Sequence, residues 1–161
     1  MEGWPESVRR VGEFLLASRA EARIEEFTEG TPTARAAAEA VGCKLGQIVK
    51  TLVVVGDGKP AVVLVPGDRR ADLPKVAGAL GVERVRVARA DEVRTVTGFE
   101  PGAVAPFPLP AVEHVLVERT LLAQDVVWVG AGSERHMAGI GPAELVRLAR
   151  ARPVDAVELA S

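Results

Sequence analysis

Two aliphatic runs separated by a short connection most constrain the fold of this chain. Residues 51–55 and 61–65 read TLVVV and AVVLV, and the five residues between them include Asp57 followed by Gly58. An Asp-Gly pair between such runs is typical of a tight hairpin turn, because both central positions of that turn require a positive φ. The sequence therefore predicts two adjacent antiparallel strands whose aliphatic side chains are expected to be buried.

The rest of the chain mixes helical and extended patterns without strict alternation. This mixture predicts a single α+β domain with a mixed sheet. Thr31 or Thr33 is expected to cap the second helix, which should end at Gly42. The expected helices cover residues 5–19, 34–41, 73–80, 90–96 and 142–150, and further strands are expected at 22–27, 85–87, 114–117, 126–129, 139–140 and 153–159.

Composition excludes several classes of protein. A net charge of −2 over 161 residues argues against strong non-specific binding to a nucleic-acid backbone, although it leaves room for a pocket that holds one nucleotide end. The single cysteine, Cys43, cannot form an internal disulfide and fits a reducing cytosol. Because no apolar run approaches about 18 residues, we expect a cytoplasmic protein with no membrane association.

Lys50 is the first candidate functional residue. The chain has four lysines, and Lys50 alone adjoins a run of aliphatic residues. A cation beside an apolar wall needs an anionic partner or a functional reason. The alternative is a stem that packs on the core while the ammonium reaches water, and the local sequence favours this second interpretation.

A second candidate is the segment Gly130-Ala131-Gly132-Ser133, which follows a predicted strand. Glycines at such a point let backbone N–H groups converge on an anion or an ester oxygen. An isolated G-x-G-S is weak evidence, and an ordinary tight turn at a strand exit explains it equally well. Ser133 and His136 are three residues apart but lack the G-x-S-x-G elbow, so they are weak evidence for a serine hydrolase.

Three segments taken in order, 46–54, 97–107 and 127–133, resemble the YbaK/ProX family of aminoacyl-tRNA deacylases, which is related to the editing insertion of bacterial prolyl-tRNA synthetase. The resemblance covers nearly the whole chain and implies one editing domain over residues 1–161. It also implies a curved mixed β-sheet, partly barrel-like, with flanking helices.

The resemblance further implies a trans-editing hydrolase that deacylates mischarged tRNA, with tRNA for proline carrying a small wrong amino acid as substrate. The near-invariant lysine of the family falls on Lys50. Alanines replace a glycine and a serine of the family pattern at Ala103 and Ala105, and His136 and Met137 lie where some members carry an acidic residue. The implied catalytic residues are Lys50, Gly102 and Ser133, and the implied substrate-binding residues are Thr51, Thr97, Gly98, Phe99, Pro106, Gly130 and Gly132.

In this interpretation, backbone N–H groups near Gly102 or in the 130–133 segment stabilise the developing oxyanion, and Lys50 holds a phosphate or the ribose. No side chain is an evident general base, so the resemblance points to a positioned water or the substrate's ribose hydroxyl. No cofactor and no metal are expected, because two histidines and one cysteine are widely separated. The expected partner is the aminoacyl-tRNA acceptor end, with prolyl-tRNA synthetase as a further candidate and the oligomeric state open.

Two other functions remain compatible with the sequence. One is a non-catalytic adaptor that binds aminoacyl-tRNA or a synthetase, for which Ala103 and Ala105 leave room. The other is a small-molecule esterase that uses the same pocket. All three interpretations predict that Lys50, the 97–106 loop and the 130–133 segment line one cleft.

Overall fold

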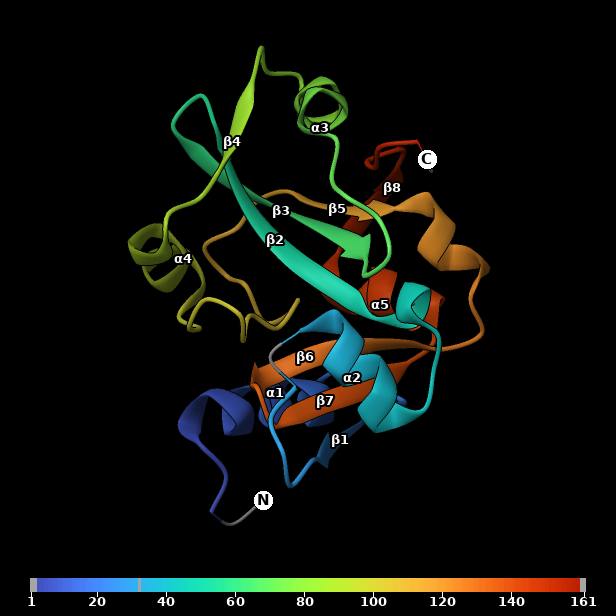
Figure 1. Ribbon diagram of the computed structural model, residues 1–161. Coiled ribbons are helices and arrows are strands. Elements are labelled where there is room, and N and C mark those ends of the chain that lie inside the picture. Colours follow the sequence, from blue (N-terminus) through green and yellow to red (C-terminus); the bar gives the residue numbers. More distant parts are fainter. Residues whose placement is uncertain (1–2, 32, 160–161) are drawn as a thin grey trace.

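A computed structural model describes residues 3–31 and 33–159, so Pro32 and both ends of the predicted domain 1–161 lie outside the described residues. The described strands form two sheets (Figure 1). An antiparallel three-stranded sheet has the order β1 (Arg23–Glu26), β7 (His136–Ile140), β6 (Val127–Ser133). A mixed five-stranded sheet has the order β4 (Val85–Val87), β2 (Val49–Gly56), β3 (Lys59–Pro66), β5 (Val115–Glu118), β8 (Ala151–Val154).

The predicted hairpin forms the centre of the larger sheet. β2 and β3 pair in antiparallel register up to Gly56 and Lys59, and the turn residues Asp57 and Gly58 have φ values of 51° and 73°. Two positive φ values in succession give a turn whose twist matches that of the strands. β5 and β8 then add in parallel on the far side of β3.

Five α-helices and two 3-10 helices cover these sheets within the described residues. They are α1 (Glu6–Ala17), α2 (Ala34–Val41), η1 (Leu45–Gln47), α3 (Leu73–Leu80), α4 (Ala90–Thr97), η2 (Arg119–Ala123) and α5 (Pro142–Ala149). Thr33 caps α2, because its hydroxyl accepts the N–H of Ala36, and Gly42 ends the helix with φ 75°. None of the described helices is long and apolar enough to cross a bilayer.

The α+β class is confirmed, with two differences in detail. The described strands do not close into a barrel, because the two sheets meet at their edges through one isolated parallel bridge between Ile48 and Trp128. The C-terminal strand covers Ala151–Val154 rather than 153–159, and Val157 instead makes an isolated bridge with Ala71.

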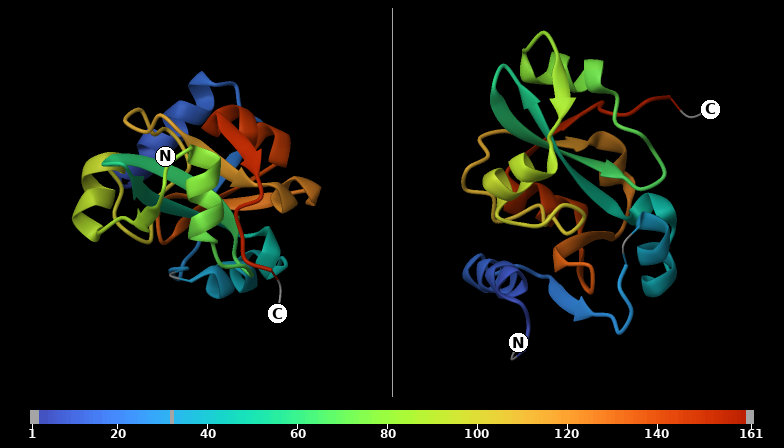
Figure 2. Two further views of the ribbon diagram at one scale, coloured as in Figure 1. Left: turned by 90° about the horizontal axis from the view of Figure 1, so that it is seen from above. Right: turned by 60° about the vertical axis from the view of Figure 1, so that its left-hand side comes forward.

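One apolar cluster joins the two sheets and the N-terminal helix. It includes Val11 of α1, Val53 of β2, Val129 of β6 and Leu145 of α5, all buried. α1 packs against β6, although the two elements are far apart in the sequence. Figure 2 shows them side by side. The first helix therefore supports the end of β6, where the candidate site begins.

Candidate functional site

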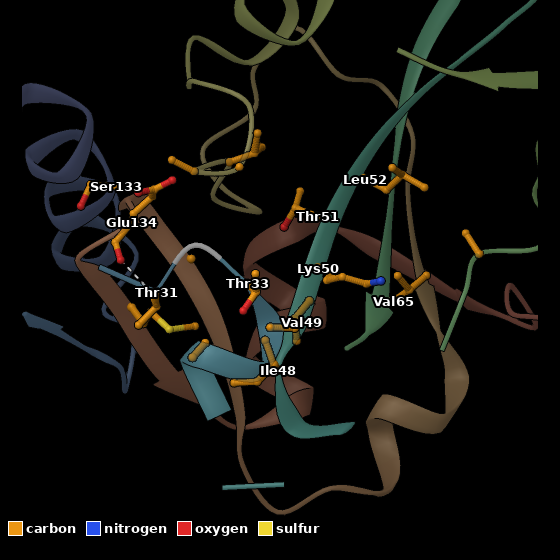
Figure 3. A pocket seen from close by; sticks show the side chains of 18 residues that line it. Thr31, Thr33, Ile48, Val49, Lys50, Thr51, Leu52, Val65, Ser133 and Glu134 are labelled. Carbon is orange, nitrogen blue, oxygen red and sulfur yellow. Dashed lines mark hydrogen bonds between the residues drawn. The ribbon is translucent and has the colours of Figure 1, made fainter. Parts of the chain in front are cut away.

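A cavity of about 400 Å³ lies at the junction of the two sheets (Figure 3). The three segments singled out in the sequence all reach it: β2 through Lys50 and Thr51, the loop after α4 through its residues 102–104, and the end of β6. The start of α2 forms a further wall. The residues that line the cavity are Thr31, Thr33, Ala34, Ala37, Ile48, Val49, Lys50, Thr51, Leu52, Val65, Ala71, Gly102, Ala103, Val104, Gly130, Ser133, Glu134 and Met137.

Lys50 lies at one margin of this cavity. Its side chain is exposed, and its Nζ donates to the backbone carbonyl of Arg69 over 3.4 Å, a distance at the weak limit for a hydrogen bond. Figure 3 shows the Lys50 stem beside Val65, on the opposite side of β2 from Thr51. The geometry thus combines both sequence interpretations, because the stem packs on apolar residues while the ammonium remains available at the margin.

Thr51 is the polar side chain of β2 that faces the inner part of the cavity. Its Oγ1 is buried and has no hydrogen-bond partner among the described residues. Leaving a buried hydroxyl unpaired costs about 1–3 kcal/mol, and such a group in a native structure calls for an explanation. A polar atom of a bound ligand would supply the missing partner.

The first part of the 97–106 loop is structural. The buried Thr97 hydroxyl donates to Val93 O over 2.7 Å and accepts the N–H of Phe99 over 3.0 Å. Gly98 ends α4 with φ 75°, and Phe99 is 1% exposed, with the Arg10 guanidinium 4.1 Å from its ring centroid. In the described structure these predicted substrate-binding residues shape the loop and do not line the cavity.

The second part of the loop reaches the cavity. Gly102, with φ 84°, and the neighbouring residues Ala103 and Val104 all line it. The N–H of Ala103 already donates to Glu100 O over 2.9 Å, so this amide is not available to an oxyanion. Pro106 lines a different cavity, of about 730 Å³, near the end of α5.

The 130–133 segment is part of a strand, and its prediction as a tight turn is wrong. β6 continues to Ser133 because β7 supplies backbone partners, with an irregular register between Gly130 and Ser133. Gly132 has φ 104°, and its carbonyl accepts the hydroxyl of Ser7 over 2.8 Å. Gly132 itself does not line the cavity, whereas Gly130 and Ser133 do. The turn proper consists of Glu134 and Arg135.

Ser133 and His136 face each other across that turn. Ser133 Oγ lies 2.6 Å from His136 Nδ1 and accepts the N–H of Arg135 over 3.0 Å. Glu26 is the cross-strand partner of His136, and its Oε2 lies 3.2 Å from His136 Nε2. His136 Nε2 has no hydrogen-bond partner among the described residues, so its contact with Glu26 is electrostatic. The sequence spacing indicated the first pair, but only the pairing of β1 with β7 adds Glu26.

Burial lowers the pKa of His136, because a buried imidazolium loses its hydration; the charge of Glu26 offsets part of this effect. His136 is therefore neutral near pH 7. Burial also raises the pKa of the Cys43 thiol, which lies outside the cavity and donates to Lys44 O. Across residues 3–31 and 33–159, no three His, Cys, Asp or Glu side chains gather in a way that would hold a metal ion.

A family model described as the aminoacyl-tRNA editing domain matches residues 28–148. The chain belongs to this family. The match includes β2, the 97–106 loop and β6, which are the elements that surround the cavity.

Relatives of this editing domain include complete synthetases and smaller proteins. A proline–tRNA ligase of Acidithiobacillus ferrooxidans is 32% identical over 128 residues, which cover 73% of this chain and 22% of the ligase. The editing domain thus spans about a fifth of the length of the ligases it matches. An Enterococcus faecalis protein named as a candidate Cys-tRNA(Pro)/Cys-tRNA(Cys) deacylase is 27% identical, with 76% of this chain and 75% of that protein covered.

A solved structure shows the same fold over almost the whole editing domain. The crystal structure of a candidate trans-editing enzyme for prolyl-tRNA synthetase superposes with a TM-score of 0.90 at 35% sequence identity. The superposition covers 98% of this chain and 100% of the other. Membership of the YbaK/ProX group, which the three sequence segments predicted, is confirmed.

Proposed function

We propose that this chain is a trans-editing aminoacyl-tRNA deacylase, and that the editing domain extends over residues 1–161. It hydrolyses the ester that joins a wrong amino acid to the terminal ribose of tRNA. The observation that carries this proposal is the meeting of β2, the 102–104 segment and the end of β6 around one cavity, in a chain of the editing-domain family. A cavity of about 400 Å³ has the size of a small-ligand site.

Each lining group has a place in this proposal. Lys50 supplies positive charge at the margin, where the terminal phosphate or the ribose would enter. The unpaired Thr51 hydroxyl forms a hydrogen bond with a polar atom of the aminoacyl-ribose end. Gly102 and Gly130 allow the substrate to approach the backbone closely, and Ser133 contacts the reacting ester. Thr97, Gly98 and Phe99 act indirectly, because they fix the shape of the loop that carries Gly102.

The proposed substrate is tRNA for proline that carries a small wrong amino acid, such as alanine or serine. Short side chains line the cavity at Ala37 and Ala103, which fits a small acyl group. The proposed partners are the acceptor end of that tRNA and prolyl-tRNA synthetase, which would provide recognition of the tRNA body. The proposed location is the cytoplasm, which a function in translation supports.

The proposal is tested by single-turnover hydrolysis of a panel of mischarged tRNAs. We expect alanyl- or seryl-tRNA for proline to lose its amino acid faster than correctly charged prolyl-tRNA. Faster hydrolysis of the prolyl ester would contradict the proposed specificity. If the protein bound these tRNAs but hydrolysed none of them, the result would contradict an enzymatic function. It would indicate a non-catalytic adaptor that binds aminoacyl-tRNA.

A further inference from the structure

Two arginines follow Lys50 along the margin of the cavity. The Lys50 ammonium points away from Thr51 (Figure 3), and its Nζ donates to the backbone carbonyl of Arg69 over 3.4 Å. Arg70 comes next, and Ala71 again lines the cavity. We propose that Arg69 and Arg70 bind phosphates of the unpaired acceptor end of aminoacyl-tRNA. This inference rests on the proposed function and extends it from the ester to the strand that carries the ester.

None of these three cations forms an ion pair in the part of the chain that the structure describes. The nearby carboxylates Asp72 and Asp155 are engaged elsewhere, because Asp72 accepts the backbone N–H of Lys75 and Asp155 accepts its ammonium. The remaining carboxylates, Asp68 and Glu158, are exposed. Positive charge is therefore available at this margin of a protein whose net charge is −2, and a phosphodiester group would complement it.

The backbone that carries both arginines is held firmly by the C-terminal segment. The Asp72 N–H donates to Ala156 O over 2.8 Å, and the Glu158 N–H donates to Arg70 O over 2.9 Å. Glu118, whose side chain is fully buried, in turn accepts the N–H of Ala156 over 2.8 Å. These bonds fix where the two arginine side chains leave the backbone, without using the guanidinium groups.

Both guanidinium groups are free to meet a ligand. Arg69 is half-buried, and its Nη1 donates to Glu158 O over 3.4 Å, which is at the weak limit for a hydrogen bond. The bridge between Ala71 and Val157 keeps the next residues extended, so adjacent side chains alternate between faces. Ala71 lines the cavity and Arg70 extends into water. A guanidinium binds phosphate oxygens through parallel N–H donors, so the arginines would contact the strand just outside the cavity.

The chemistry of the proposed substrate explains why two further cations are needed. The ester is on the terminal ribose of a single strand, and each preceding nucleotide adds one phosphate. When the ester enters the cavity, these phosphates must pass over its margin. Proteins hold single strands by positive groups that follow the phosphate backbone. Two such contacts would orient the strand while the rest of the acidic protein repels nucleic acid.

The first test measures binding of tRNA for proline over a range of salt concentrations. We expect the double variant Arg69→Gln, Arg70→Gln to bind roughly 10-fold more weakly at low salt, the range for loss of two exposed charge pairs. The slope of log affinity against log salt should shrink by about 1.4, because each contact to a single strand contributes about 0.7. Replacement of both arginines by lysine should keep most of this slope, since the charge remains. Arg23→Gln, exposed on the outer strand β1, is the matched control.

The second test compares hydrolysis of mischarged tRNA with hydrolysis of the same aminoacyl ester of adenosine, which has no phosphate. The loss in the double variant should be confined to tRNA. Equal losses on both substrates would overturn the proposal, because the arginines would then act by shaping the cavity wall. Wild-type affinity and salt slope in the double variant would also overturn it. A wild-type protein that hydrolyses neither substrate would end the proposed deacylase function, and the salt slopes would still decide whether the arginines bind phosphate.

Discussion

Gly132 lies against the backbone of Ser7, and this contact joins α1 to the candidate site. A Cβ at position 132 would lie 2.8 Å from the carbonyl carbon and oxygen of Ser7, in a segment whose φ of 104° already disfavours other residues. Both atoms belong to the backbone, so neither can move without displacing the start of α1. The position of Ser133 therefore depends on a glycine that does not itself line the cavity.

We expect Gly132→Ala to lower both stability and deacylation. Forcing the start of α1 away from β6 costs on the order of 1–3 kcal/mol, the range for overpacking and backbone strain. Urea denaturation and single-turnover rates measure the two effects. Gly78→Ala is the control, because Gly78 lies in α3 with open space around it and should tolerate alanine or gain slightly. Equal stability and equal deacylation rates in the two variants would contradict a close contact between Gly132 and the Ser7 backbone.

Lys50→Ala should lose most deacylation while the protein stays folded. The side chain is exposed and its one hydrogen bond to the described residues is long, so stability hardly depends on it. Loss of the ammonium should cost on the order of 2–4 kcal/mol of transition-state stabilisation if the substrate excludes water there. Lys50→Arg should also be poor, because a planar guanidinium does not replace a compact ammonium.

The control for Lys50 is Lys59→Ala, which removes an exposed lysine at the other end of the same hairpin. Circular dichroism reports folding in each variant. A folded Lys50→Ala protein with the wild-type rate would show that Lys50 only packs its stem on the core.

Thr51→Val should separate the contribution of the Thr51 hydroxyl to substrate binding from its contribution to folding. Valine keeps the shape of threonine and removes a buried hydroxyl that has no partner in the free protein, so unfolding free energy should stay constant or rise by up to about 1–3 kcal/mol. Deacylation should weaken, because the substrate loses that hydrogen bond. The measurements are thermal unfolding and the substrate dependence of the rate. A loss of stability without any change in rate would assign Thr51 a structural role.

Burial of His136 should make stability depend on pH. The pKa of His136 is lowered in the folded protein. As the pH falls through the ordinary histidine pKa of about 6.5, the unfolded chain therefore binds more protons than the folded one. The free energy of unfolding should consequently decrease as the pH decreases through this region. Urea midpoints at pH 7.5 and 5.5 should therefore differ more in wild type than in His136→Asn. His114→Asn is the control, because the His114 side chain is 60% exposed. An equal pH response in wild type and His136→Asn would contradict this account.

Local signals in the sequence predicted the elements that local chemistry determines. Helix α2 has the expected bounds because Thr33 caps it and Gly42 ends it, and the hairpin forms because Asp57 and Gly58 adopt positive φ. The class of fold could be predicted for the same reason, and local patterns also drew attention to Lys50 and the 130–133 segment. The 97–107 loop, and the meeting of the three segments at one site, required the family resemblance.

Contacts between distant segments explain what the sequence did not reveal. Phe99 was assigned to the substrate, but Arg10 of α1 covers its ring and the core surrounds it. Glu26 carries no local signal, and only the register of β1 on β7 brings it to His136. The 130–133 segment contains two glycines and so resembles a turn, yet β7 pairs with it and keeps it extended as far as Ser133.

The isolated bridge between Ile48 and Trp128 bears on the width of the cavity. Lys50 and Thr51 belong to one sheet and Ser133 to the other, so the two walls of the cavity come from different sheets that a shared apolar cluster holds together. On the small sheet, the Trp128 ring lies over its partner Gly139, where an added Cβ would be 3.1 Å from the ring. A substitution that shifts one sheet against the other should therefore change the width of the cavity without altering any residue that lines it.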